Sequence, residues 1–166
     1  MEIKGGCLCG AVRYTAEADP TSATVCHCRD CQKFTGSAFA ALVRVPKEAL
    51  TIEGTLRTFS SLGGSGNPIL RHFCPECGSS IAEEPGTRPG VIILNVGTFD
   101  DPSIAKPGRE VFRDDALPWV DVHGEIPRFA KTTRLRPRSV RLRWHSRSCG
   151  GNEIYFGRRG FRGRKS

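Results

Sequence analysis

The grouping of its cysteines constrains this chain more than any other feature. Of its eight cysteines, seven fall into three short groups. These are C-x-C (Cys7, Cys9), C-x-C-x-x-C (Cys26, Cys28, Cys31) and C-x-x-C (Cys74, Cys77), and Cys149 stands alone. In a reducing compartment, cysteines grouped in this way are more often metal ligands or catalytic groups than disulfides. We therefore expect a metalloprotein in which Cys149 is a free thiol without a role.

The compartment follows from what the sequence lacks. The N-terminus, MEIKGGCLCG, has no apolar segment of the kind found in a signal peptide. No stretch approaches the ~20 apolar residues of a membrane span. We expect a cytoplasmic protein that makes no membrane contact. Disulfide or redox use of the cysteines is the alternative that this compartment disfavours.

Charge divides the chain into two parts. Residues 1–130 carry 13 Lys and Arg against 16 Asp and Glu, whereas residues 131–166 carry 12 Lys and Arg against the single acid Glu153. We expect one domain over 1–130 and a basic, disordered tail over 131–166. Three interpretations of the tail stay open: a solvated terminus, a segment that attracts nucleic acid or another polyanion, and a terminus without selected function.

The apolar pattern of the first part predicts a mainly β fold. Val12 and Tyr14 alternate with polar residues, as in a half-buried strand. Residues 37–45 and 90–99 are apolar runs of strand length, and residues 50–59 suggest a hairpin around Gly54. Two strands flank the turn at residues 74–77. Helical turns are expected only at residues 28–36 and 46–50, a loop at 61–68 and an irregular connection at 100–110.

The sequence CPECG predicts half of a structural zinc site. Proline fixes the turn, and the glycine after the second cysteine permits a positive φ, so that backbone N–H groups can point at the thiolates. A tetrahedral site needs a second pair of ligands, and CLCG, which also ends in glycine, is the natural candidate. Cys7, Cys9, Cys74 and Cys77 would then form a closed four-thiolate zinc site that holds the fold.

The remaining three cysteines have the ligand number of an open zinc site. Cys28 and Cys31 share one face of a helical turn, and Cys26 ends the preceding strand. Three protein thiolates leave the fourth position of zinc for another ligand. A substrate thiol bound there would have a lowered pKa and a fixed orientation.

Several alternatives remain at this point. One alternative is a single mixed metal site in which the other cysteines are idle. The spacing does not fix which pairs of cysteines share a metal. His27 is either a ligand or, between two cysteines, a side chain that points away. His72 precedes a ligand on a strand and is expected to be structural. Thiolate ligands favour zinc over iron.

Together these motifs resemble the glutathione-dependent formaldehyde-activating enzyme family, which includes centromere protein V. The matching stretches are GGCLCGAVRY, CHCRDCQKFTGSAFA, FCPECGSSI, VGTFDDP and LPWVDVHGEIPRF. The resemblance implies a β-tent of small antiparallel sheets pinned by zinc. It implies a structural zinc on Cys7, Cys9, Cys74 and Cys77 and a catalytic zinc on Cys26, Cys28 and Cys31. It also implies a carbon–sulfur lyase that acts on S-hydroxymethylglutathione, the adduct of formaldehyde and glutathione.

A glutathione site needs cations for two carboxylates. The candidates near the motifs are Arg29, Lys33, Arg71 and Arg113, with residues 35–39 and Trp119 as further candidates for the pocket wall. For each of the four cations a plain surface charge is the alternative, and for Trp119 it is a place in the core. The competing function is a non-catalytic zinc-binding module whose basic tail binds nucleic acid, as the resemblance to centromere protein V suggests.

Overall fold

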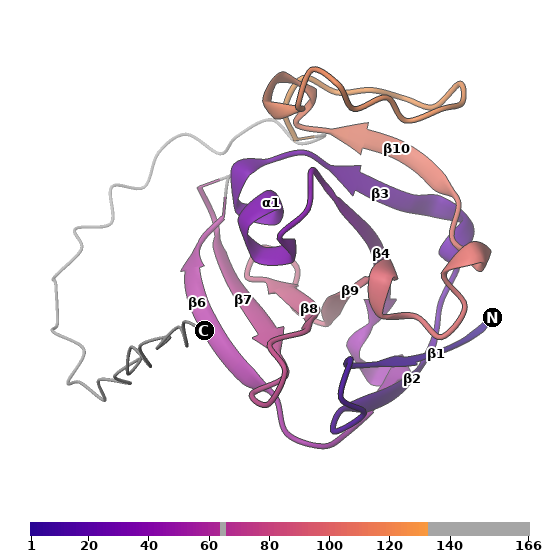
Figure 1. The fold of residues 1–166 in the computed structure, drawn as a ribbon, viewed down its shortest axis with the longest axis vertical. Helices are drawn as coiled ribbons and strands as arrows, with labels where there is room; N and C mark the ends of the chain where they lie inside the picture. The colour runs from indigo at the N-terminus through magenta and orange to yellow at the C-terminus, as the bar shows by residue number, and fades with distance from the viewer. Residues whose placement is uncertain (64–65, 133–166) are drawn as a thin grey trace, which may run out of the picture. The chain divides into compact units, whose positions relative to one another are not determined.

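The computed structural model describes residues 1–63 and 66–132, and these form two β-sheets and one α-helix (Figure 1). The smaller sheet has the order β1-β2-β5, and both of its strand pairs are antiparallel. Its strands are β1 (Glu2–Gly6), β2 (Arg13–Glu17) and β5 (Leu50–Glu53). In β2 the side chains alternate strictly between buried and exposed. The predicted half-buried strand around Tyr14 is therefore confirmed.

The larger sheet has seven strands in the order β10-β3-β4-β9-β8-β7-β6. In Figure 1 it curves from β10 at the top to β6 at the left, and α1 lies inside the curve. The strands are β3 (Ala23–Cys26), β4 (Ala40–Pro46), β6 (Arg57–Leu62), β7 (Pro68–Phe73), β8 (Ser80–Pro85), β9 (Val91–Asn95) and β10 (Pro107–Val111). The expectation of a mainly β fold is thus confirmed.

The main core fills the space between the two sheets. Val43 and Val45 of β4 and Leu94 of β9 pack with Ile3 and Tyr14 of the smaller sheet. Burial of each such side chain contributes about 1.5–3 kcal/mol. A second apolar cluster contains Ala40 and Leu42. Because side chains alternate along a strand, β4 can serve one cluster with each of its faces.

Helical structure is short, as the sequence predicts. The helix α1 (Arg29–Thr35) begins after Cys28 and ends at Gly36, whose φ of 66° is the left-handed conformation of a helix C-cap. The turn expected at residues 46–50 is a 3₁₀ helix, η2 (Lys47–Ala49). The described residues form four more 3₁₀ turns. Three lie between strands, namely η1 (Pro20–Ser22), η3 (Val96–Thr98) and η4 (Pro102–Ile104), and η5 (Arg113–Asp115) follows β10.

The hairpin predicted over residues 50–59 is wrong. Its two halves belong to different sheets, since β5 pairs with β2 and β6 pairs with β7. Gly54 lies where the chain passes from one sheet to the other, with φ 92°. A Cβ at this position would lie 2.0 Å from the backbone oxygen of Ala11. The glycine thus permits a close crossing of two backbones rather than a tight turn.

The connection expected at residues 100–110 contains a strand instead. Residues 107–111 form β10, which pairs in parallel with β3 at the edge of the larger sheet. The sheet is therefore mixed, and not built from antiparallel pairs alone. The amides of Glu110 and Phe129 bond to the carbonyls of Pro127 and Glu110, at 2.9 and 3.0 Å. The segment at residues 127–131 thus follows the outer side of β10.

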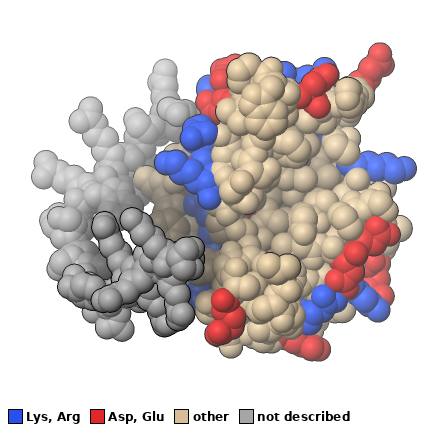
Figure 2. Space-filling model, viewed as in Figure 1, with Lys and Arg blue, Asp and Glu red and all other residues tan. Residues whose placement is uncertain are grey.

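Among the described residues no helix has the length and apolar character needed to cross a membrane. Acidic and basic side chains both lie around the periphery of the face drawn in Figure 2, and its middle is largely uncharged.

Candidate metal centres

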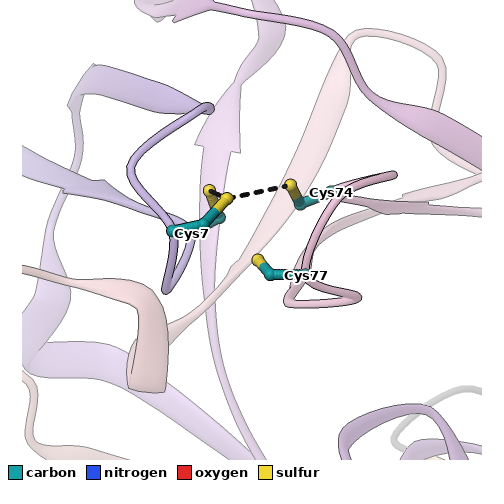
Figure 3. Close-up of side chains that lie close together, drawn as sticks. Cys7, Cys74 and Cys77 are labelled. Atoms are coloured by element: carbon teal, nitrogen blue, oxygen red, sulfur yellow. Dashed lines mark hydrogen bonds between the residues drawn. The ribbon is translucent and has the colours of Figure 1, made fainter.

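The first cysteine group joins two turns that are distant in the sequence. Cys7 and Cys9 follow β1, and Cys74 and Cys77 lie in the turn between β7 and β8. Their sulfur atoms all lie within 4.8 Å of one another. The Cys7–Cys9 and Cys9–Cys74 Sγ distances are 3.4 and 3.8 Å. Four thiolates at about 2.3 Å from a tetrahedral zinc lie about 3.8 Å apart, so the group fits such an ion. The labelled sulfurs turn toward one another in Figure 3.

Both turns have the backbone conformation that the two glycines predict. Gly10 and Gly78 follow the second cysteine of each pair and have φ values of 79° and 74°. Their amides donate to the carbonyls of Cys7 and Cys74, at 3.1 and 2.9 Å. The amide of Val12 in turn donates to Cys7 Sγ, at 3.2 Å. Each turn therefore presents its sulfurs to a common point and supports their negative charge.

The second group lies where β3 meets α1. Cys26 ends the strand, Cys28 caps the helix and Cys31 lies in its first turn. All three are buried, and their sulfurs lie within 4.8 Å of one another. Ala40 and Leu42 of β4 pack against them. Among the described residues this group has three ligand atoms, one fewer than the first group.

The thiols of each group influence one another's ionisation. Hydrogen bonds from the Cys26 and Cys31 thiols lower the pKa of Cys28, while the contacts of Cys31 with Cys26 and with Cys28 raise the pKa of Cys31. The amide of Cys31 also donates to Cys28 Sγ, at 3.5 Å, at the positive end of the helix. Cys28 is therefore the first thiol of this group to ionise. In the other group, the hydroxyl and amide of Ser79 lower the pKa of Cys77 to about 5.

The seven described cysteines form no disulfide. They form two separate groups rather than one mixed site. Cys149 lies outside the described residues. The nucleic-acid prediction also falls on a tail of which residues 133–166 lie outside them, so it stays a prediction, as does the domain boundary at residue 130.

His27 lies between two cysteines but belongs to a different network. Its Nε2 lies 3.0 Å from Oε1 of Glu110, and both side chains are fully buried. Arg128 Nε donates to Oε2 of the same carboxylate at 2.7 Å. His72 is held by Thr58 and by Glu84, at 2.9 and 3.1 Å. Neither histidine is a member of a ligand group, and the structural interpretation of both is the one that the contacts favour.

A buried ion pair lies beneath α1. Arg71 of β7 and Glu83 of β8 are cross-strand partners, with Nε and Oε1 at 3.9 Å. Burial, above all, raises the pKa of Glu83 to about 7, and the charge of Cys28 adds to the shift. Asp30 and Phe34 of α1 also contact Arg71. The pair therefore couples the helix that holds the second cysteine group to the sheet.

A cavity of about 670 Å³ lies between the two cysteine groups. Its lining comes from residues 33–41, 77–80 and 95–98. Residues 35–37 and Phe39 are part of this lining, as the sequence predicts. Trp119 is not, and it is not a core residue either, because its side chain is 75% exposed.

The four cations predicted to meet carboxylates have different surroundings. Only Lys33 lines the cavity. Arg29 bonds to Gln32, Arg71 is buried with Glu83, and Arg113 lies 3.6 Å from Glu110. The three arginines are thus engaged within the protein.

The sequence reasoning missed Glu83, Glu110 and Asn95. Each is a buried polar residue within or at the end of a strand. For Asn95 a signal was available, because it interrupts the apolar run of residues 90–99. Glu83 and Glu110 lie in SIAEEP and PGREV, where no apolar pattern marks them as buried. Their hydrogen-bond and ion-pair partners come from other parts of the chain and could not be predicted from the sequence.

Comparisons with known proteins agree with the motifs. Residues 2–115 match the sequence model of the family described as glutathione-dependent formaldehyde-activating enzyme. A Halomonas elongata protein named "Putative glutathione-dependent formaldehyde-activating enzyme" is 30% identical over 86 residues. That match covers 49% of this chain and 55% of the relative, so the chain spans about half the length of the curated relative it matches. A crystal structure of a Rhodobacter sphaeroides protein aligns with a TM-score of 0.49 at 22% identity, over 75% of this chain and 98% of that one.

Proposed function

Because the chain belongs to the glutathione-dependent formaldehyde-activating enzyme family, we propose that it is a zinc-dependent carbon–sulfur lyase acting on the adduct of a small thiol and an aldehyde. In such an adduct the hydroxyl gives up its proton and its carbon–oxygen bond becomes a carbonyl. The carbon–sulfur bond breaks, and the sulfur keeps the electron pair as a thiolate. In the reverse direction a thiolate attacks the aldehyde carbon, and the oxygen takes a proton.

Two zinc ions per chain are part of the proposal. Cys7, Cys9, Cys74 and Cys77 would hold one ion with a complete set of four thiolates, which suits a structural role. Cys26, Cys28 and Cys31 would hold the other. The softness of thiolate ligands supports zinc at both. A cytoplasmic location would keep these thiols reduced.

The single observation that carries the function is the buried three-thiol group. A zinc ion held by Cys26, Cys28 and Cys31 would have a position for one more ligand and would lower the pKa of a thiol bound there. The residues around the group would exclude bulk water, since Ala40 and Leu42 cover it. The N-terminus of α1 would support negative charge on Cys28.

The cavity supplies room for the rest of the thiol. Ala40 both packs against the three-thiol group and lines the cavity, so the two are neighbours. Thr35, also in the lining, is fixed by a bond from its hydroxyl to the carbonyl of Cys31, at 2.8 Å. Holding the thiol body there would orient its sulfur toward the cysteines, and orientation is a large part of catalysis for such an addition.

Turnover of thiol–aldehyde adducts tests the function. We expect zinc-loaded protein to release formaldehyde from the adducts of several small thiols faster than buffer does, and the Cys28→Ser variant to match buffer. Cys149→Ser is the control for loss of a cysteine outside both groups and should keep full activity. A Cys28→Ser variant as active as the wild type would refute the proposal, as would a wild type that accelerates no adduct.

A further inference from the structure

The cavity between the two cysteine groups has walls that belong to both. On one side it is lined by Ala40, which also packs against the three-thiol group. On the other side Cys77 and Gly78 of the CPECG turn line it. A Cβ built on Gly36, Gly78 or Gly97 would meet no atom within 4 Å, so the glycines in the lining leave it open. A molecule of the size of a modified amino acid fits in about 670 Å³.

Most hydroxyls of the lining are already bound within the protein. Thr35 donates to Cys31, Ser80 to Phe34 and Thr98 to Asn95, each through a backbone carbonyl. Ser79 accepts the amide of Leu8 at 3.0 Å. These groups hold the walls in place. These hydroxyls are therefore not the groups that we expect to bind a ligand.

Asn95 retains an atom without a partner. Its Nδ2 donates to the carbonyl of Ser80 at 3.0 Å, which fixes the amide plane. Its Oδ1 is buried and accepts no hydrogen bond among the described residues. A buried acceptor without a donor is costly, so a ligand that brings an N–H group is favoured here.

Lys33 is the single charged side chain among the described residues that line the cavity. It forms no ion pair with any described residue, and the lining contains no Asp or Glu. The arginines that lie nearest in sequence or fold, Arg29 and Arg71, bond elsewhere. Among the described residues the lining thus offers one cation, the exposed Lys33, which can pair with one carboxylate and not with two.

We propose that this cavity binds a small thiol that carries one carboxylate and one N–H donor, the pattern of an N-acylated cysteine. The carboxylate would pair with Lys33, and the N–H would donate to Oδ1 of Asn95. The inference rests on the proposed function, because it names the thiol whose adduct is the substrate. Glutathione has two carboxylates, and the second finds no cation in this lining.

Thioethers test the cavity apart from the metal chemistry, since an S-methyl group cannot ionise. We would titrate zinc-loaded full-length protein, followed by ¹H–¹⁵N NMR, with N-acetyl-S-methylcysteine. Two comparison ligands each lack one group: N-acetyl-S-methylcysteamine has no carboxylate, and 3-(methylthio)propionate has no N–H. The expected losses of affinity are about tenfold for the carboxylate and about fivefold for the N–H. S-methylglutathione should bind no more tightly than N-acetyl-S-methylcysteine.

Variants assign the carboxylate contact. Lys33→Gln should abolish the preference for the carboxylate ligand, and Lys33→Arg should restore most of it. Lys106→Gln, a change at an exposed lysine outside the cavity, should leave all affinities unchanged.

Three results would overturn the inference: equal binding with and without the carboxylate, no effect of Lys33→Gln, or S-methylglutathione binding at least tenfold more tightly. Absence of binding by every thioether would do the same. None of these results depends on turnover. If the protein turned over glutathione adducts but gave one of these results, the proposed function would stand and only the inference about the cavity would be refuted.

Discussion

Nε2 of His27 lies 3.0 Å from Oε1 of Glu110, and the two side chains are completely buried. His27 is flanked by Cys26 and Cys28, whereas Glu110 belongs to β10 and also accepts from Arg128. The contact therefore ties the three-thiol group to the edge strand and to the segment that runs beside it. His27 thus lies between two cysteines of this group and is bound within the fold, through Glu110, rather than being a member of the group.

Removal of the Glu110 carboxylate should destabilise the protein strongly. Glu110→Ala leaves the buried His27 ring and the Arg128 guanidinium without their partner, and we expect the free energy of unfolding to fall by about 3 kcal/mol. Urea denaturation of zinc-loaded protein measures the change. Glu125→Ala, at an exposed acid, should change stability by less than about 0.5 kcal/mol. Equal stabilities of the two variants would contradict the network.

The close crossing at Gly54 predicts that alanine at this position destabilises the protein more than alanine at Gly90. Gly54 and Gly90 both have positive φ, at 92° and 83°, but a Cβ meets the Ala11 carbonyl at the first and nothing at the second. Gly90→Ala should cost about 1–2 kcal/mol from the backbone conformation alone. Gly54→Ala should cost several kcal/mol more, because backbone atoms must move. Thermal unfolding compares the two, and similar losses would argue against the close crossing.

Glu83 should make stability depend on pH. Burial raises its pKa to about 7 from the ordinary 4.5, so between these values the folded state binds the proton more readily than the unfolded state. Its contribution to stability is therefore greatest below pH 4.5 and is lost as pH rises through 7. Relative to Glu83→Gln, wild-type protein should lose about 1 kcal/mol between pH 6 and 8.

The measurement is urea denaturation of zinc-loaded protein across that pH range. Glu48→Gln, at an exposed acid, is the control and should follow the wild type. A pH profile of Glu83→Gln that also follows the wild type would rule out the raised pKa.

The parts of the fold that were predictable depend on near neighbours in the sequence. The helix after Cys28 has its cap and its terminating Gly36 within nine residues, and the strands beside the CPECG turn pair with each other. The parts of the fold that were predicted wrongly depend on contacts with residues that are distant in the sequence. β10 looks irregular because it contains Pro107 and Gly108, and it is a strand through its pairing with β3. Gly54 has the same local signature whether it makes a turn or a crossing.

In the candidate site, too, the features that depend on local sequence were predictable and those that depend on distant elements were not. Cysteine spacing indicated both groups, because metal ligands cluster in the chain, and the glycines after Cys9 and Cys77 indicated which two pairs form the first group. The cavity was only partly foreseen, through residues 35–39. Its opposite walls, with Asn95 and the turn after Cys77, are supplied by other elements of the fold. The role of Glu110 likewise depends on Arg128, which reaches it from a segment outside the strands.

We propose that the chain holds two separate metal sites and that the one on Cys26, Cys28 and Cys31 can be lost without loss of the fold. The decisive measurement is zinc per chain on purified wild type and on Cys28→Ser, with circular dichroism as the check on folding. We predict two zinc ions in the wild type and one in the folded variant. A single zinc ion in the wild type that survives Cys28→Ser would show that the three cysteines are not a metal site, and it would contradict the proposed enzyme.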